Sequence, residues 1–316
     1  MEPPVAPPSM NHLVSVVIPV HDGEATIARA LDSVLGQTYE PLEIIVIDDA
    51  STDATSTILA SYGESRVRVI SSADNVGPSE ARNMGIRAAS GDYIAFLDAD
   101  DEWRSDKLSK QMALMMARKR ATLVTCQGQY RTSSGSLVGR VYDGSPPDGA
   151  EAWRDMLATA PVHTSCVLAP RKDLVTLGGF DGALLVGEDQ DLWIRLSLIG
   201  EVACVDEPLV TIHQIADSFM RRNITREADF VIPMIEGHIA RMREQLSHGD
   251  IRRILGMRYA QIGRNLYING GNAKGARLVL RAIVFGYQPV AHLLFLLHAS
   301  PPGRWLKRRL RSTRNG

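Results

Sequence analysis

Strand-like and helix-like segments alternate along the first hundred residues, and this alternation limits the fold more than any other feature of the sequence. Strand-like runs occupy residues 14–20, 42–51, 67–72 and 92–100. The first two are continuous runs rich in Val and Ile, which are typical of buried strands of a parallel sheet. The segments between them place apolar side chains, such as Ile27 and Leu31, at helical spacing. Strict alternation implies βαβ crossovers, so we predict an α/β fold with a doubly wound, mostly parallel sheet.

The pattern changes after about residue 110. Short strand-like runs, mixed with two helical segments, continue to about residue 215 and indicate a second, less regular half of the same domain. From there onward apolar positions recur at helical spacing, so we predict a helical C-terminal appendage. The predicted organisation is a flexible Pro-rich leader at 1–12, a domain at 13–215 with halves 13–110 and 111–215, and a helical region with a basic tail at 216–316.

The composition is that of an ordinary globular protein, with 45% hydrophobic and 22% charged residues in a chain of 316. The three cysteines have no paired or CxxC spacing, which argues against a disulfide framework and against a zinc site. Residues 1–12 lack the basic and apolar regions of a signal peptide. We therefore expect a cytoplasmic protein, and nothing in the sequence indicates a nucleic-acid partner.

Two C-terminal segments bear on membrane contact. The apolar stretch 278–299 approaches the roughly 20 residues that a membrane span needs, but Gly286 and Pro289 interrupt it, so we predict two packed helices. The last 13 residues carry six Lys or Arg and no acid. This charge is typical either of a solvated end or of a tail that contacts an anionic surface, here the inner face of the membrane. Both interpretations stay open at this point.

Polar side chains follow all four predicted strands. The carboxyl ends of parallel strands meet at one edge of a doubly wound sheet, and ligands bind there. The residues concerned are Asp22 after the first strand, Asp48 and Asp49 after the second, Asp74 and Asn75 after the third, and Asp98 and Asp100 after the fourth. We therefore expect a polar site at this edge.

Asp98 and Asp100 form a DxD pair at the end of the fourth strand. Residues two apart on a strand point to the same side, so both carboxylates can face the site. Oxygen ligands on a turn suit Mg²⁺ or Mn²⁺, which take part of their ligand shell from substrate phosphates. The alternative is that Asp98, Asp100 or Asp101 only caps the helix that follows near Trp103.

The neighbouring residues argue against three other phosphate chemistries. A haloacid-dehalogenase-type phosphatase carries its DxDx[TV] motif after the first strand, whereas the DxD pair here follows the fourth. A nucleotidyltransferase needs a Gly-rich basic loop after the first strand, and a dehydrogenase needs GxGxxG, but this chain has "PVHDGEA" there. The remaining interpretation is a nucleoside-diphosphate ligand held by a metal ion.

Three stretches, which follow one another in the expected order along the chain, resemble the family-2 glycosyltransferases of the GT-A fold. They are "VSVVIPVHDGEATIARALDSVLGQTYEPLEIIVIDDASTDAT", "NVGPSEARNMGIRAASGDYIAFLDADDEW" and "GEDQDLWIRLSLIG". The resemblance extends from residue 14 to about residue 215. It implies inverting transfer from a nucleoside-diphosphate sugar, with a UDP-sugar as the favoured donor and Mn²⁺ or Mg²⁺ as the cofactor. The implied acceptor is a hydroxyl of a glycan or lipid-linked molecule in cell-surface or secreted glycan biosynthesis.

The resemblance also implies roles for individual residues. Pro19, Val20 and Asp22 would line the nucleoside pocket, Asp49 would meet the base or ribose, Asn75 and Arg82 would close over the nucleotide, Asp98 would lie near the ribose, and Asp100 would bind the metal. Asp189 would be the general base, with Glu188 as its partner or as an acceptor-binding group. A base is needed because the acceptor hydroxyl has a pKa far above neutral.

His213 lies where many members of the family have an aromatic-Arg-x-His segment near the diphosphate or metal, so it is a second candidate metal ligand. Here residues 210–212 are Val-Thr-Ile, which departs from that segment, and a purely structural role for His213 is the alternative. Two other functions of the whole chain stay open. They are a non-catalytic nucleotide-sugar-binding protein and a sugar-nucleotide hydrolase.

Overall fold

The computed structural model describes residues 12–142, 144, 146–159, 162–213, 223–269 and 272–299. The predicted leader, apart from its last residue, and the predicted basic tail lie outside these residues. The chain divides into two compact units. The first consists of Met1–Met156, Pro161–Ala183 and Glu188–Ile215, and the second of Leu157–Ala160, Leu184–Gly187 and Ala216–Gly316.

The first unit alternates strands and helices. Its strands are β1 (Val14–Val20), β2 (Leu42–Asp48), β3 (Val67–Ser71), β4 (Tyr93–Phe96), β5 (Glu102–Trp103), β6 (Ala121–Arg131), β7 (Leu137–Arg140), β8 (Leu168–Pro170) and β9 (Glu201–His213). Its helices are α1 (Ile27–Leu35), α2 (Thr55–Ser61), α3 (Gly77–Ala88), α4 (Lys107–Ala117), the 3₁₀ helix η1 (Thr164–Cys166), α6 (Arg171–Thr176) and α7 (Glu188–Ile199). Helix α5 (Trp153–Thr159) begins in the first unit and ends in the second.

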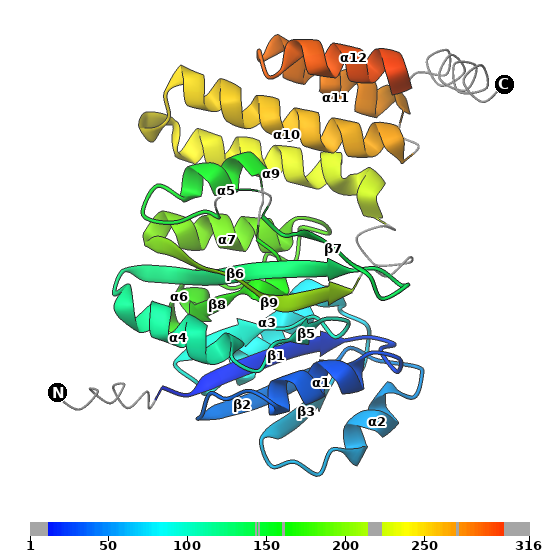
Figure 1. Ribbon diagram of the computed structural model, residues 1–316, viewed down its shortest axis with the longest axis vertical. Coiled ribbons are helices and arrows are strands. Elements are labelled where there is room, and N and C mark those ends of the chain that lie inside the picture. Colours follow the sequence, from blue (N-terminus) through cyan, green and yellow to red (C-terminus); the bar gives the residue numbers. More distant parts are fainter. Residues whose placement is uncertain are drawn as a thin grey trace. The chain divides into compact units, whose positions relative to one another are not determined.

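One mixed, nine-stranded sheet runs through the first unit. Its order is β3-β2-β1-β4-β8-β6-β9-β5, with β7 paired to β6. The strands from β3 to β4 pair in parallel, and β8 is antiparallel to both β4 and β6. Figure 1 shows β1 and β6 pointing the same way across the sheet. The parallel N-terminal half confirms the predicted α/β fold. The predicted second strand ends early, at Asp48, because the chain turns there and the Asp48 side chain accepts the N–H of Ser51.

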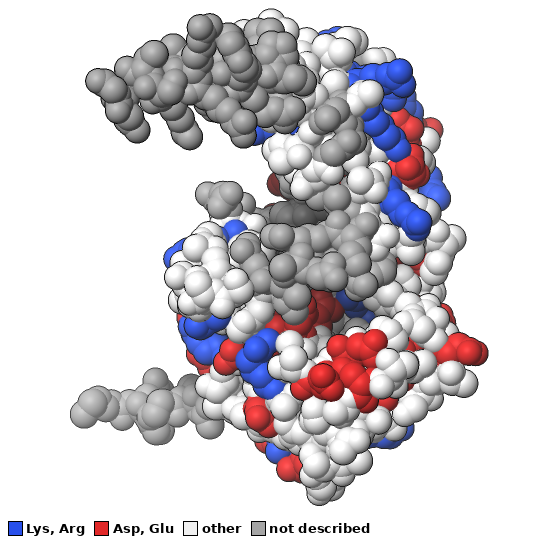
Figure 2. All heavy atoms as spheres, turned by 90° about the vertical axis from the view of Figure 1, so that its right-hand side faces the viewer, with Lys and Arg blue, Asp and Glu red and all other residues white. Residues whose placement is uncertain are grey.

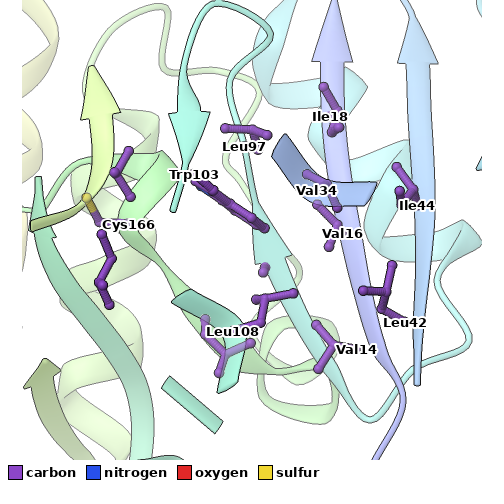
Figure 3. Packing of buried hydrophobic residues seen from close by; sticks show 14 of the residues in the cluster. Val14, Val16, Ile18, Val34, Leu42, Ile44, Leu97, Trp103, Leu108 and Cys166 are labelled. Carbon is purple, nitrogen blue, oxygen red and sulfur yellow. The ribbon is translucent and has the colours of Figure 1, made fainter. Parts of the chain in front are cut away.

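Helices cover both faces of the parallel half. Val14, Val16 and Ile18 of β1 belong to a buried cluster that also contains apolar side chains of α1 and α4 (Figure 3). Val17 points to the opposite face, since side chains alternate along a strand. There it meets α3 so closely that a Cβ added to Gly85 would lie 2.3 Å from Val17 Cγ1. The doubly wound arrangement is therefore confirmed, and full burial of each such Val or Ile contributes about 1.5–3 kcal/mol.

From residue 223 onward the described elements of the second unit are helical. They are η2 (Ile224–Arg226), α9 (Glu227–Arg241), η3 (Arg243–Gln245), α10 (His248–Ile268), α11 (Asn272–Val284) and α12 (Pro289–Ala299). Helices α10 and α11 pack closely because Gly275 has no side chain at their contact. A Cβ there would lie only 2.7 Å from the carbonyl oxygen of Gly263. The break between α11 and α12 confirms the predicted helix pair at 278–299. Within the described part of the chain, none of the helices combines the length and the hydropathy that a membrane span requires.

Candidate active site

The ends of β1 and β2 carry two of the predicted nucleoside contacts, and both carboxylates hold backbone N–H groups of neighbouring loops. Asp22 has a left-handed backbone, with a φ of 51°, and accepts the N–H of Thr52 at 2.7 Å. Asp49 accepts the N–H groups of Val76 and Gly77 at 2.7 and 2.9 Å. These hydrogen bonds fix the loops at the carboxyl edge of the sheet. A contact of either side chain with a nucleoside stays a prediction.

The other predicted nucleoside contacts lie at the same edge. Pro19 and Val20 end β1, where Val20 pairs with Asp48 of β2, and Asn75 is exposed in the loop before α3. Figure 2 looks onto the face toward which β1 points, and red acidic side chains gather on its lower part. The structure thus brings the predicted residues to one edge, as the parallel topology requires.

Arg82 of α3 connects two carboxylates across the centre of the site. Its side chain is only 8% exposed. Nη2 donates to Asp98 Oδ1 at 2.8 Å, and Nη1 donates to Glu188 Oε1 at 3.1 Å. Burial lowers the pKa of Arg82, but the two carboxylates raise it by more, so the net pKa is above its ordinary value. The predicted closure of Arg82 over a nucleotide stays a prediction, whereas its bridge between two acids is a feature that the sequence did not reveal.

The turn before α7 is fixed to α3 by Asn83. The Asn83 amide donates to the carbonyl of Phe180 at 2.9 Å and accepts the N–H of Phe180 at 2.8 Å. Gly179 adopts a φ of 70°, and a Cβ there would lie 2.3 Å from Asn83 Oδ1, so the turn requires glycine. Phe180 packs edge-on against Phe96 and Trp193, and Trp193 is buried in the core. This turn therefore gives the start of α7 a defined position.

Helix α7 begins with the predicted catalytic pair. Burial, together with the charge of Asp189, raises the pKa of Glu188 to about 7, although Arg82 opposes the shift. Burial also raises the pKa of Asp189, against the opposing effect of Arg82. Asp191, one turn further, instead pairs with Arg195 at 2.7 Å. Both carboxyl groups of the pair at the helix start therefore have raised pKa values, and a raised pKa makes a carboxylate a stronger base.

Asp98, Asp101 and His163 form a second group. One possible ligand atom from each lies within 4.8 Å of the other two. Burial raises the pKa of Asp98, but Arg82 and His163 lower it by more, so this carboxyl stays ionised at neutral pH. Two carboxylate oxygens and an imidazole nitrogen are a donor set that Mn²⁺ accepts. His163 was missed in the sequence because only the pairing of β8 with β4 brings its segment beside Asp98.

Asp100 adds further negative charge to this region. Burial and the charge of Asp98 raise the pKa of Asp100, while His163 and Arg29 lower it to a smaller extent. Burial and the charges of Asp98 and Asp100 likewise raise the pKa of Asp101, so negative charge is crowded at this turn. A divalent cation would relieve this repulsion, so the residues present fit the metal ion that the family resemblance implies.

Asp101 does not cap the following helix, so that interpretation is wrong. Helix α4 begins only at Lys107, because Glu102 and Trp103 instead form β5 and pair with β9. Asp101 is 1% exposed and accepts the hydroxyl of Ser165 at 2.5 Å and the N–H of His213 at 3.3 Å. It therefore ties the DxD turn to η1 and to the end of β9.

His213, the second predicted metal ligand, lies beside the cluster but is not one of its three members. Its N–H contacts Asp101, and its Nε2 lies 3.5 Å from a carboxylate oxygen of Glu102. Burial is the main cause that lowers the pKa of His213. A neutral imidazole retains a nitrogen lone pair for a metal, so the role of His213 stays a prediction.

Comparison with known proteins identifies the family of this chain. Residues 15–167 match the family described as Glycosyl transferase family 2. The amylovoran biosynthesis glycosyltransferase AmsB of Erwinia amylovora is 31% identical over 216 residues, which are 64% of this chain and 69% of that protein. The UDP-Glc:alpha-D-GlcNAc-diphosphoundecaprenol beta-1,3-glucosyltransferase WfaP of Escherichia coli is 41% identical over 184 residues, 58% of this chain and 70% of that protein. Some other relatives match over less than half of their own length.

A solved structure shares the fold. It is that of the mannosyltransferase PcManGT from Pyrobaculum calidifontis, in complex with GDP-Man and Mn²⁺. The two structures superpose with a TM-score of 0.62, and the match covers 96% of this chain and 85% of that one. At 22% sequence identity the likeness establishes a common architecture only.

Proposed function

This chain belongs to glycosyltransferase family 2, and we propose that it transfers a sugar, with inversion, from a nucleoside-diphosphate sugar to an acceptor hydroxyl in a metal-dependent reaction. The observation that carries the proposal is the bridge made by Arg82. This single guanidinium bonds both to Asp98, at the proposed donor edge, and to Glu188, in the proposed base pair. The groups needed for donor binding and for acceptor activation therefore adjoin each other.

The donor side of the proposal uses the strand-end residues. Pro19, Val20 and Asp49 would border the nucleoside. Asp100 would hold the cation beside the group formed by Asp98, Asp101 and His163, with His213 as the alternative imidazole. When bound there, Mn²⁺ or Mg²⁺ supplies positive charge beside the departing diphosphate. Asp101 keeps this turn in place through Ser165. Support for the cation comes from the crowded carboxyl groups and from the Mn²⁺ in the mannosyltransferase complex.

The acceptor side uses the first residues of α7. We propose that Asp189 takes the proton of the acceptor hydroxyl while that oxygen bonds to the anomeric carbon. The bond from this carbon to the diphosphate oxygen breaks on the opposite face, which inverts the configuration. Glu188, held by Arg82, positions Asp189 or binds the acceptor. The start of α7 suits an ionised base because the N-terminal end of a helix favours negative charge.

The names of the relatives support a finer assignment. WfaP is named for UDP-Glc and for a diphosphoundecaprenol-linked acceptor, and AmsB for the biosynthesis of amylovoran. We therefore favour a UDP-sugar donor and a lipid-linked acceptor in the assembly of a cell-surface or secreted glycan. Such an acceptor places the enzyme in the cytoplasm at the inner face of the membrane. We also propose that the glycosyltransferase domain ends near residue 215 and that the helical C-terminal region follows it.

A ligand panel tests the donor. UDP-Glc, UDP-GlcNAc, UDP-Gal and GDP-Man are each added to the full chain with and without Mn²⁺, and thermal unfolding is measured. A donor at a hundred times its Kd stabilises by about 2.7 kcal/mol, which raises the Tm by roughly 5 °C or more. We expect this shift for at least one UDP-sugar and only with Mn²⁺. Stabilisation by none of the four would contradict the proposed donor site.

A further inference from the structure

A cavity of about 270 Å³ lies within the second unit, apart from the residues of the proposed active site. Its volume is close to the lower end of the range for small-molecule sites, about 300–1,000 Å³. The polar residues that line it are Thr159, Gln261, Arg264, Tyr287, Gln288 and His292. The other lining residues are two alanines and Met257, and none of the lining residues is an Asp or Glu.

His292 of α12 supplies the first sign of a ligand. The residue is 2% exposed, yet its Nε2 has no hydrogen-bond partner among the described residues. The ring packs against Tyr287 at a centroid distance of 5.6 Å, which restricts its orientation. Buried polar atoms are nearly always hydrogen-bonded, and an unsatisfied one is costly. Because His292 is one of the residues that line the cavity, an anion bound there would supply the partner that the described residues do not.

Arg264 of α10 supplies the second sign of a ligand. Its guanidinium lies 5.1 Å from the ring centroid of Phe295, which limits the positions that the cation can adopt. Burial and the charge of Arg264 lower the pKa of His292, so the imidazole is neutral and can donate from Nε2. The side-chain amide of Gln261 offers further N–H groups beside them. A positive charge and several donors without a nearby lining acid favour an anion with several oxygen atoms.

We propose that this cavity binds a phosphate group, with Arg264 balancing its charge and His292 and Gln261 donating hydrogen bonds to its oxygens. The phosphate can come from free phosphate or from the head of a lipid phosphate. Helix α12 bears on the second source, because Val290, Leu293 and Leu294 are 71%, 53% and 48% exposed on the helix that carries His292. The lipid source rests on the lipid-linked acceptor proposed above, whereas the phosphate site itself does not.

Binding measurements on the full chain test this site without use of transferase activity. Inorganic phosphate and decyl phosphate are titrated calorimetrically at constant ionic strength into the wild type, Arg264→Gln and His292→Phe. Arg277→Gln, which removes an exposed arginine of α11, and Asp98→Asn, in the proposed donor site, are the controls. We expect Arg264→Gln and His292→Phe to weaken binding by about tenfold or more, since hydrogen bonds to charged groups are strong. Both controls should stay within about twofold of the wild type.

The possible outcomes distinguish a lipid-phosphate site, a free-phosphate site and the absence of a site. Tighter binding of decyl phosphate than of inorganic phosphate, lost in Arg264→Gln, supports the site and assigns it to a lipid head. Equal binding of both probes, lost in the same variant, supports the site and assigns it to free phosphate. Absence of binding at millimolar concentration, or binding that only Asp98→Asn abolishes, overturns the proposal. If His292→Phe fails to fold, the exposed Arg264 still provides the test.

Discussion

Arg82 and Glu188 are 106 residues apart in the sequence, yet Nη1 of the arginine lies 3.1 Å from Oε1 of the glutamate. The same guanidinium reaches Asp98 at 2.8 Å, so one side chain of α3 connects the end of β4 with the start of α7. Separation of these elements would leave a buried charge without a partner. Breaking a buried pair in this way costs about 3–5 kcal/mol. The bridge therefore keeps the two sides of the proposed site together.

Arg82→Gln should change the pH dependence of transfer. The positive charge of Arg82 lowers the pKa values of Glu188 and Asp189. Its removal raises both values, and a carboxyl base acts only above its pKa. The acidic limb of the profile of kcat/KM against pH should therefore move upward by about one unit, and the rate at pH 7 should fall. Arg82→Lys keeps the charge and should move the limb less. Identical limbs in the two variants would contradict this account.

Asp189→Asn should remove chemistry and spare donor binding. An amide cannot accept the hydroxyl proton, so kcat should fall by about 10²–10⁴-fold. The Kd of the donor, measured by calorimetry with Mn²⁺, should change by less than about threefold. Asp181→Asn, an exposed carboxyl in the loop before α7, is the matched control and should leave both quantities unchanged. A full loss of donor binding in Asp189→Asn would mean that this residue binds the nucleotide instead.

Replacement of each histidine can identify the imidazole that meets the cation. His163 belongs to the group with Asp98 and Asp101, whereas His213 lies beside Glu102. We expect His163→Gln to weaken Mn²⁺ binding by about tenfold or more, and His213→Gln to have a smaller effect. Electron paramagnetic resonance of free Mn²⁺ gives the affinities directly. The opposite order would favour His213, the ligand expected from the sequence.

Lys107 should make stability depend on pH in the alkaline range. It is fully buried, with Nζ 3.7 Å from the ring centroid of Trp103, and burial lowers its pKa to about 8. The unfolded chain keeps the ordinary value of 10.5, so it binds more protons between these values and the free energy of unfolding rises with pH there. In Lys107→Met this increase should be smaller by about 2–3 kcal/mol between pH 7 and 10.

Urea denaturation across this pH range measures the difference. Lys119→Met removes an exposed lysine from the turn after α4 and is the matched control. Its pH dependence should follow that of the wild type. Equal slopes in all three proteins would show that Lys107 carries an ordinary pKa in the folded state.

The parallel half of the sheet could be predicted because its signals are local. The run 14–20 became β1 with the same bounds, since a strand buried on both faces must be almost wholly apolar. Trp103 was placed next to a helix because its pairing partner, Val210, lies far along the chain. A pairing between residues so far apart leaves no local pattern in the sequence, so β5 was missed.

The candidate site divides in the same way. Asp98 and Asp189 stand in short motifs, so their types and spacing could be recognised in the sequence. His163 has no motif, and Arg82 has its partners on two different elements, 16 and 106 residues away in the sequence. Their roles depend on the packing of β8 beside β4 and of α7 beside β6, which only the folded chain displays.

Release of nucleoside diphosphate tests the central claim most directly. The wild type and Asp189→Asn are incubated with a UDP-sugar, with and without Mn²⁺ and with and without a lipid-linked sugar acceptor, and the diphosphate is measured. Metal-dependent transfer predicts rapid release by the wild type only when both Mn²⁺ and acceptor are present, and almost none by Asp189→Asn. Equal release without acceptor would indicate a hydrolase, and the absence of turnover for every UDP- and GDP-sugar would contradict the proposed activity.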